Sequence, residues 1–195
     1  MSRTRAVALL AAGLLAAVAG HAAMQPPSTT GDFDPAHTRI GFTLRTRWGQ
    51  QLEGRFPRYG GQVLRLSDGR QQVRVHLDAA AVEIVGYPRY TAFSRGRDFF
   101  DVERYPWASF DSDPYPPALL VEGGRLTGTL RLHGVNQREV FTVEPTGCAR
   151  PAIDCDLVAH GSVRREDYGM DEWKVAVRSR VTFELRLRLK PEVGT

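Results

Sequence analysis

Near the end of the chain, hydrophobic and polar residues alternate with a period of two. In residues 180–190 (RVTFELRLRLK), Val181, Phe183, Leu185, Leu187 and Leu189 are separated by charged residues and a threonine. Successive side chains of a β-strand point to opposite faces, so this pattern predicts a strand with one solvated and one apolar face. The apolar face covers either a packed core or the wall of a ligand cavity.

The same alternation recurs along the chain, in residues 39–45, 52–56, 73–77, 126–133, 141–143 and 157–163. Breaks rich in glycine or containing asparagine separate these segments, at residues 59–61, 68–69, 123–124 and 134–136. Many short amphipathic strands at near-regular spacing predict an antiparallel sheet that closes or doubles over.

Residues 87–106 interrupt the strand pattern. Tyr90, Phe93, Phe99 and Phe100 do not alternate, and their spacing suits one or two helical turns packed by aromatic rings. We therefore expect a short helical crossover that plugs one end of the sheet.

The N-terminus resembles a secretory leader. Arg3 and Arg5 precede an apolar run at residues 6–20, and small residues follow, so we expect cleavage after Ala22 or Ala23. A membrane anchor is the rival interpretation, but the run is shorter than the ~20 apolar residues that a spanning helix needs. The predicted organisation is a signal peptide at 1–22, a short linker at 23–31 and one domain at 32–191, in a periplasmic or secreted protein.

Charge gives little reason to expect nucleic-acid binding. The chain has 26 basic and 22 acidic side chains, and removing Arg3 and Arg5 with the leader leaves 24 against 22. So small an excess argues against a nucleic-acid partner.

Two cysteines bracket a short segment, CARPAIDC, between two strand-like runs. In an oxidising compartment we expect Cys148 and Cys155 to form a structural disulfide that pins a hairpin. A redox-active pair is less favoured because the Cys-x-x-Cys spacing is missing, and a zinc site would need further ligands nearby.

Recognisable catalytic motifs are missing from the sequence. It contains no nucleophile elbow, phosphate-binding glycine loop or His-Glu-x-x-His segment. The acidic residues Asp98, Asp101 and Glu103 could support acid–base chemistry, and residues 111–113 could contact a cation, but both groups are typical of solvated turns. We expect a protein that is not an enzyme and that holds no metal or cofactor.

A closed barrel of about eight strands has an interior that side chains can fill or that one small ligand can occupy. Small residues in the inward register, Gly54, Gly128, Ala159 and Gly161, either leave space or mark bends. If there is a cavity, we expect its wall to include Ile40, Phe42, Leu44, Phe56, Phe110, Leu130, Phe141, Leu157, Phe183 and Leu185.

Several motifs resemble the YceI-like family, in order along the chain. They are residues 33–44 (FDPAHTRIGFTL), 52–56 (LEGRF), 97–112 (RDFFDVERYPWASFDS), 128–137 (GTLRLHGVNQ) and 165–170 (REDYGM), the last with Tyr168 where the family has Phe. The resemblance assigns family-motif positions to Arg97, Asp98, Phe99, Phe100, Tyr105, Pro106, Arg165, Gly169 and Met170. Residues 82–90 and 148–155 depart from the family pattern.

The resemblance implies an all-β fold, an extended antiparallel lipocalin-like barrel with a short helical insertion. It also implies a periplasmic or secreted carrier that encloses a long apolar molecule, such as an isoprenoid or a quinone; transient membrane contact is compatible with that role. Two alternatives stay open. One is an enzyme that acts on such a molecule through Asp98, Asp101 or a tyrosine near the opening. The other is a stress-related interaction protein whose barrel is filled.

Overall fold

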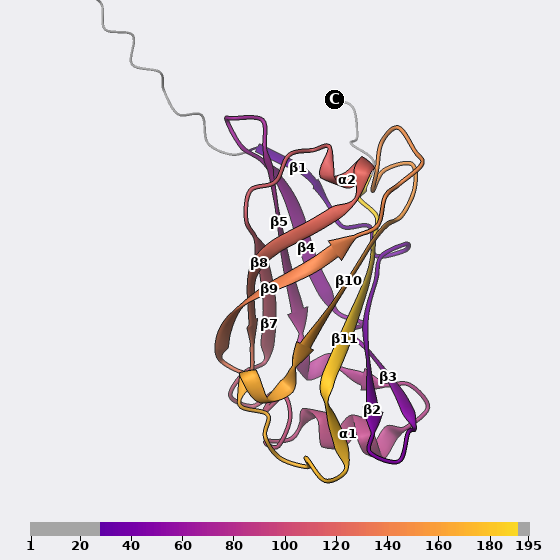
Figure 1. Ribbon diagram of the computed structural model, residues 1–195, viewed down its shortest axis with the longest axis vertical. Coiled ribbons are helices and arrows are strands. Elements are labelled where there is room, and N and C mark those ends of the chain that lie inside the picture. The colour runs from indigo at the N-terminus through magenta and orange to yellow at the C-terminus, as the bar shows by residue number, and fades with distance from the viewer. Residues whose placement is uncertain (1–27, 191–195) are drawn as a thin grey trace, which may run out of the picture.

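The computed structural model describes residues 28–190 and shows one curled antiparallel sheet with short helices at its ends (Figure 1). The expected signal peptide lies outside the described residues, as do residues 23–27 and 191–195. None of the helices within 28–190 is long and apolar enough to cross a membrane. The strands are β1 (Ser28–Asp32), β2 (Arg39–Thr46), β3 (Gln51–Arg55), β4 (Tyr59–Arg65), β5 (Gln71–Asp78), β6 (Glu83–Ile84), β7 (Trp107–Ser112), β8 (Gly124–Leu132), β9 (Val135–Val143), β10 (Leu157–Arg164) and β11 (Val177–Leu187); the helices are α1 (Pro88–Arg95) and α2 (Leu119–Glu122), with 3₁₀ turns at Ala79–Ala81 and Arg165–Tyr168.

The sheet curls until β1, at one edge, comes next to β11. Its strand order is β1-β4-β5-β7-β8-β9-β10-β11-β2-β3-β6. Just beyond β1 and β11, Phe33 and Leu189 form an antiparallel bridge, and the Lys190 amide donates to the Asp32 carbonyl at 2.9 Å. The eight strands from β1 to β11 in this order therefore form a ring, in agreement with the expected barrel. The other three strands continue the sheet beyond β11.

The two ends of the barrel carry different elements (Figure 1). Strands β2 and β3 lie toward the end that α1 covers, whereas β1 and α2 lie at the opposite end. Most inward positions of the long strands are apolar, as the alternation predicted; on β5, for example, Val73, Val75 and Leu77 are buried.

Strands β1, β4, β6 and β7 form where the alternation predicted none. Residues 28–31, expected in the linker, belong to β1, which pairs with β4. Gly60 and Gly61, expected in a break, lie within β4. A Cβ atom at Gly61 would lie 2.2 Å from the Phe33 ring, so glycine serves here to let an aromatic side chain cross the strand. The glycines therefore mark close packing and not a turn.

The expected helical crossover is present but is packed differently. Helix α1 has Pro88 at its first position and ends before Gly96. Tyr90 and Phe93, expected to pack inward, are 37% and 55% exposed. Phe100, in the loop after the helix, is the buried ring that anchors this segment, because it packs against Phe42 and Phe56 with ring centroids 6.0 and 5.9 Å apart.

The 3₁₀ turn Arg165–Tyr168 covers a weak seam in the barrel. Strands β9 and β10 pair only through Ala159 with Val143 and His160 with Thr142. Tyr168 is fully buried beside this seam, and its hydroxyl donates to Glu139 Oε1 at 2.8 Å. The hydroxyl that distinguishes Tyr168 from the family phenylalanine thus has a partner, and burial together with the Glu139 carboxylate raises the pKa of this tyrosine.

Cys148 and Cys155 form the expected disulfide. It closes the loop between β9 and β10, where Pro151 and Cys155 also form a bridge. The loop lies at the end of the barrel near α2, since the Thr146 amide donates to the Val121 carbonyl at 3.0 Å.

Replacing both cysteines by serine is expected to lower the free energy of unfolding by about 2.5 kcal/mol, because the unfolded chain regains the entropy that closing this short loop removes. Urea denaturation of the double variant and the wild type measures the difference. Wild-type protein isolated from an oxidising compartment should yield one linked peptide. Two alkylatable thiols in that protein would contradict the assignment.

Candidate ligand-binding cavity

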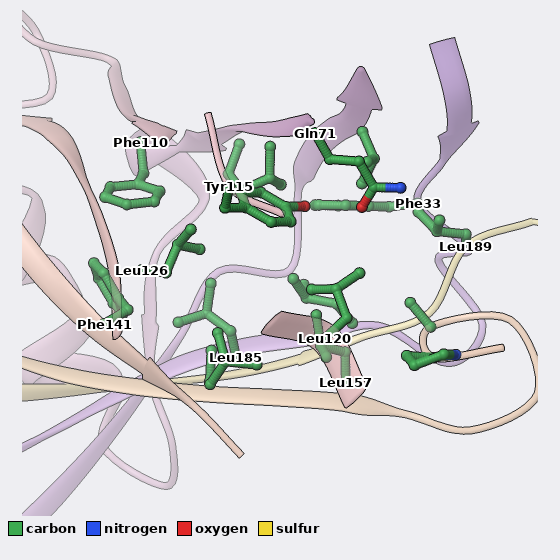
Figure 2. Close-up of a pocket in the computed structure, with 18 of the residues that line it drawn as sticks. Phe33, Gln71, Phe110, Tyr115, Leu120, Leu126, Phe141, Leu157, Leu185 and Leu189 are labelled. Atoms are coloured by element: carbon green, nitrogen blue, oxygen red, sulfur yellow. The ribbon is translucent and has the colours of Figure 1, made fainter. Parts of the chain in front are cut away.

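The barrel is not filled by its own side chains. A cavity of about 860 Å³ runs inside it, a volume typical of small-molecule sites. The inward register of β5, β8, β9, β10 and β11 supplies most of the wall. Figure 2 shows Leu126, Leu157 and Leu185 pointing into this space from different strands. The alternation seen in the sequence is therefore what makes the wall apolar.

One end of the cavity opens to solvent, and we call it the mouth. It is formed by Arg65, by Val121 on α2 and by residues 149–154 of the disulfide loop. Val121 is 44% exposed. Arg150 and Asp154 form a two-point ion pair there, Nε to Oδ2 at 2.9 Å and Nη2 to Oδ1 at 2.6 Å. The Arg150 guanidinium holds the pKa of Asp154 below its usual value, so this rim pair stays ionised.

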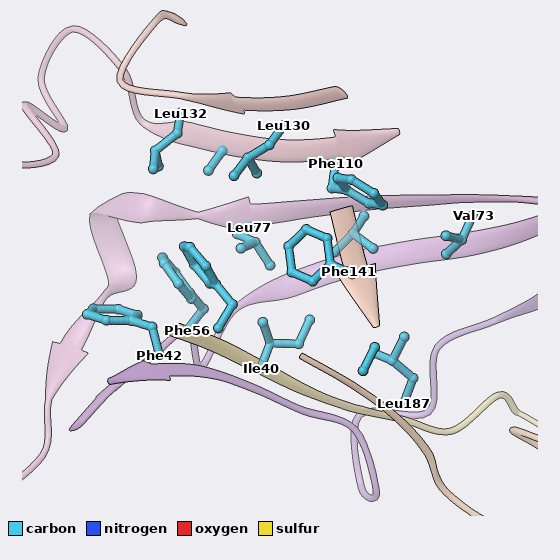
Figure 3. Close-up of a cluster of buried hydrophobic side chains, with 14 of the residues drawn as sticks. Ile40, Phe42, Phe56, Val73, Leu77, Phe110, Leu130, Leu132, Phe141 and Leu187 are labelled. Atoms are coloured by element: carbon cyan, nitrogen blue, oxygen red, sulfur yellow. The ribbon is translucent and has the colours of Figure 1, made fainter. Parts of the chain in front are cut away.

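The other end of the cavity is closed by aromatic rings. Phe110 and Phe141 stand edge to face with centroids 4.9 Å apart, and Phe183 lies 6.4 Å from Phe141. Phe42 continues the row 6.0 Å beyond Phe183, toward α1. Figure 3 shows such rings entering the interior from several strands. Past Phe42 lies a second, smaller cavity of about 270 Å³ beneath α1.

Seven of the ten side chains predicted to line a cavity lie on the wall of the larger one: Ile40, Phe110, Leu130, Phe141, Leu157, Phe183 and Leu185. Phe42 and Leu44 line the smaller cavity instead. Phe56 borders neither and packs in the aromatic row. Their contribution to ligand binding stays a prediction.

The inward glycines do not create the space. A Cβ atom would lie 2.1 Å from the Phe42 ring at Gly54, 2.4 Å from the Phe110 ring at Gly128 and 2.8 Å from the Phe141 ring at Gly161. Each glycine therefore makes room for a phenylalanine of the neighbouring strand. Among the four small residues, only Ala159 lines the cavity.

Sequence reasoning missed two polar residues on the wall. Gln71 begins β5 in the same register as Val73 and Val75, so its inward position was readable from the alternation. Tyr115 lies in a proline-rich segment, PYPP, where no strand pattern could reveal it. The two are joined by a backbone bridge, and burial raises the pKa of Tyr115 to about 12. Its phenol is therefore neutral at physiological pH.

The acidic residues considered for catalysis lie away from the larger cavity. Asp98 is exposed near α1 and accepts a hydrogen bond from Trp173 Nε1 at 3.0 Å. Asp101 is buried and lies 3.9 Å from Arg104 Nε. Neither borders the larger cavity. These carboxylates have structural partners and no access to a ligand there.

Residues 111–113 do not form a cation site either. Asp111 pairs with Arg74 and Asp113 with Arg138, on the outside of the sheet. The Arg138 guanidinium lowers the pKa of Asp113, so this carboxylate remains ionised in its ion pair. Within residues 28–190, no group of three or more His, Cys, Asp or Glu side chains could hold a metal ion.

The family-motif positions support the architecture and do not line the larger cavity. Arg165 and Met170 are buried, and Arg165 Nη1 donates a hydrogen bond to the Met170 carbonyl. Gly169 takes the left-handed conformation that ends the 3₁₀ turn. Burial lowers the pKa of Arg165. Of the others, Phe99 and Phe100 line the smaller cavity, Arg97 and Asp98 are exposed, Tyr105 packs on His133, and the Pro106 carbonyl accepts from Ala79.

The domain profile described as "YceI-like domain" matches residues 32–189, which is most of the chain. The chain belongs to the YceI-like family. The resemblance of its sequence motifs to that family is thereby confirmed, and the curled antiparallel sheet is the lipocalin-like fold of YceI-like proteins. Among curated proteins, none matches the chain by sequence.

Solved structures share this YceI-like fold. BcnA from Burkholderia cenocepacia is 23% identical over 80% of this chain and 98% of that chain, with a TM-score of 0.61. A polyisoprenoid binding domain from Saccharophagus degradans, implicated in plant cell wall breakdown, is 15% identical over 83% and 95%, with a TM-score of 0.59. A Campylobacter jejuni YceI protein is 18% identical over 97% and 94%, with a TM-score of 0.53. At these identities the likeness shows the fold.

Proposed function

We propose that the protein binds one long apolar molecule, of isoprenoid type, in the barrel cavity and carries or stores it in the periplasm or outside the cell. The observation that carries the proposal is the open cavity of about 860 Å³ with its apolar wall. Each methylene moved from water into such a space contributes about 0.8 kcal/mol, so a long tail binds without many polar contacts. The polyisoprenoid-binding neighbour with the same fold supports this ligand class.

A filled, inert barrel is disfavoured by the same observation. Side chains that filled the interior would leave few voids larger than a water molecule, whereas this cavity is far larger. An open apolar space of this size is unfavourable to keep unless a ligand uses it, because its wall atoms lack packing partners on one side.

The proposal is tested by the melting temperature of delipidated protein with added geranylgeraniol, a C20 isoprenoid alcohol. A ligand at 100 times its Kd stabilises the folded state by about 2.7 kcal/mol, which should raise the melting temperature by roughly 5–10 °C for a domain of this size. An unchanged melting temperature with geranylgeraniol and with longer polyprenols would contradict the proposal.

Replacing Asp98 by alanine is expected to leave geranylgeraniol affinity within about twofold of wild type. This carboxylate does not border the larger cavity. Its contact is the Trp173 indole, and an exposed hydrogen bond adds little to stability. The Kd of the folded variant, measured by fluorescence titration, checks this. A folded Asp98→Ala protein that binds normally but has lost a chemical conversion of the ligand would favour the enzyme alternative.

A further inference from the structure

Two buried polar side chains interrupt the mainly apolar wall close to the mouth. Gln71 is 7% exposed and Tyr115 is 5% exposed, and both border the cavity. Each backbone amide donates to the other residue's carbonyl at 2.8 Å. Residues paired in this way across an antiparallel bridge project their side chains to the same face, about 5 Å apart at Cβ. The carboxamide and the phenol therefore enter the cavity together.

The protein leaves one polar atom of this pair unsatisfied. The buried Gln71 Oε1 atom has no hydrogen-bond partner among residues 28–190. A buried acceptor without a donor is unfavourable, so the site is complete only when something in the cavity supplies a hydrogen. Figure 2 places Gln71 and Phe33 at the end of the cavity opposite Phe110 and Phe141.

The chemistry of the pair restricts what can complete it. The Gln71 oxygen only accepts, whereas the Tyr115 hydroxyl, kept protonated by burial, can donate or accept. A neutral hydroxyl or amide on the ligand could donate to Gln71 and accept from Tyr115 at once. A ketone or ether could accept from Tyr115 but could not donate to the Gln71 oxygen. A carboxylate or phosphate would bring negative charge against that oxygen and would fit only if the carboxamide turned over to present its NH2 donors.

The arginines near Gln71 and Tyr115 do not form a site for an anionic ligand end. Arg150 is held in the two-point ion pair with Asp154, and Arg65 is exposed at the rim. Leu120, Leu157 and Leu185 lie on the opposite side of the cavity (Figure 2).

We propose that Gln71 and Tyr115 form the polar subsite of the cavity and select a long-chain ligand whose polar end is neutral and donates a hydrogen bond, an alcohol, a phenol or an amide. The tail then extends along the wall toward Phe110 and Phe141. This inference rests on the proposed function and specifies which end groups the same cavity accepts.

The test compares three ligands with one C20 tail: geranylgeraniol, its methyl ether, which cannot donate, and geranylgeranyl monophosphate. Delipidated wild-type protein should bind the alcohol about 3- to 10-fold more tightly than the ether, the range that one hydrogen bond supplies. Gln71→Leu should abolish this preference while binding the ether at least as tightly as wild type does. Tyr115→Phe should weaken both ligands by a similar factor.

Gln51→Leu is the matched control, because Gln51 is an exposed glutamine on β3 and its loss should leave the preference unchanged. Melting temperatures of the ligand-free variants establish that each is folded. A preference that persists in Gln71→Leu, or a wild-type protein that binds the monophosphate most tightly, would overturn the subsite. Failure of all three ligands, and of longer polyprenols, to bind wild type would overturn the proposed function itself.

Discussion

Replacing Phe56 by alanine is expected to lower the free energy of unfolding by about 3–5 kcal/mol, the range for removing a fully buried aromatic ring. Phe56 is 2% exposed and packs against Phe42 and Phe100 at the end of the aromatic row near α1. Its ring centroid is 5.5 Å from that of Phe42 and 5.9 Å from that of Phe100, so its loss opens a void between the barrel and the loop after α1.

The informative comparison is Phe183→Ala, which removes the same group from a ring that borders the larger cavity. Because Phe183 already faces open space on one side, it has fewer contacts to lose. We expect it to cost less than Phe56→Ala in delipidated protein, below about 3 kcal/mol. Its main effect should be a smaller rise in melting temperature when geranylgeraniol is added.

Urea denaturation of both variants, with and without ligand, separates the two positions. Arg186→Ala serves as the exposed control on β11, next to the inward Leu185. Equal destabilisation by Phe56→Ala and Phe183→Ala, with the ligand-induced rise unchanged in both, would place Phe183 in an ordinary packed core.

Replacing Ala159 by tryptophan is expected to weaken geranylgeraniol binding by at least 100-fold. Ala159 is a small residue of β10 that borders the larger cavity, so an indole there occupies space that a ligand tail needs. Excluding even four methylenes costs about 3 kcal/mol, on the order of 100-fold in affinity. Stability should change little, because the new ring enters open space and not a filled core.

His160→Trp is the matched control. His160 follows Ala159 on β10, points to the outer face and is exposed, so the same indole there should leave affinity unchanged. The Kd values of both variants and their melting temperatures without ligand decide the result. Normal binding by a folded Ala159→Trp protein would mean that the ligand lies elsewhere.

Much of the barrel could be predicted from the alternation of side chains. β5, β8, β10 and β11 each carry an unbroken period of two, and burial follows it. β4 was missed for a physical reason. Gly60 and Gly61 read as a break, and only the positions of His76 and Phe33 in space explain why glycines stand in a strand.

The candidate site also has a part that the sequence predicts and a part that it does not. Inward wall residues such as Leu130 and Leu185 follow from strand register, since each strand fixes its own faces. Tyr115 and the disulfide loop could not be placed, because their positions depend on how a proline-rich segment and a connection between strands fold over the mouth. Register also cannot tell which inward side chains face a cavity and which face each other, as Phe56 shows.

The most direct measurement is mass spectrometry of the ligand that accompanies the protein. The full-length chain and the Ala159→Trp variant would be purified without denaturant, weighed intact under native conditions and then extracted with organic solvent. We expect wild type to carry about one long-chain molecule with a neutral, hydrogen-donating end group, and the variant to carry none. A wild-type extract with no more long-chain material than that of Ala159→Trp would contradict the account.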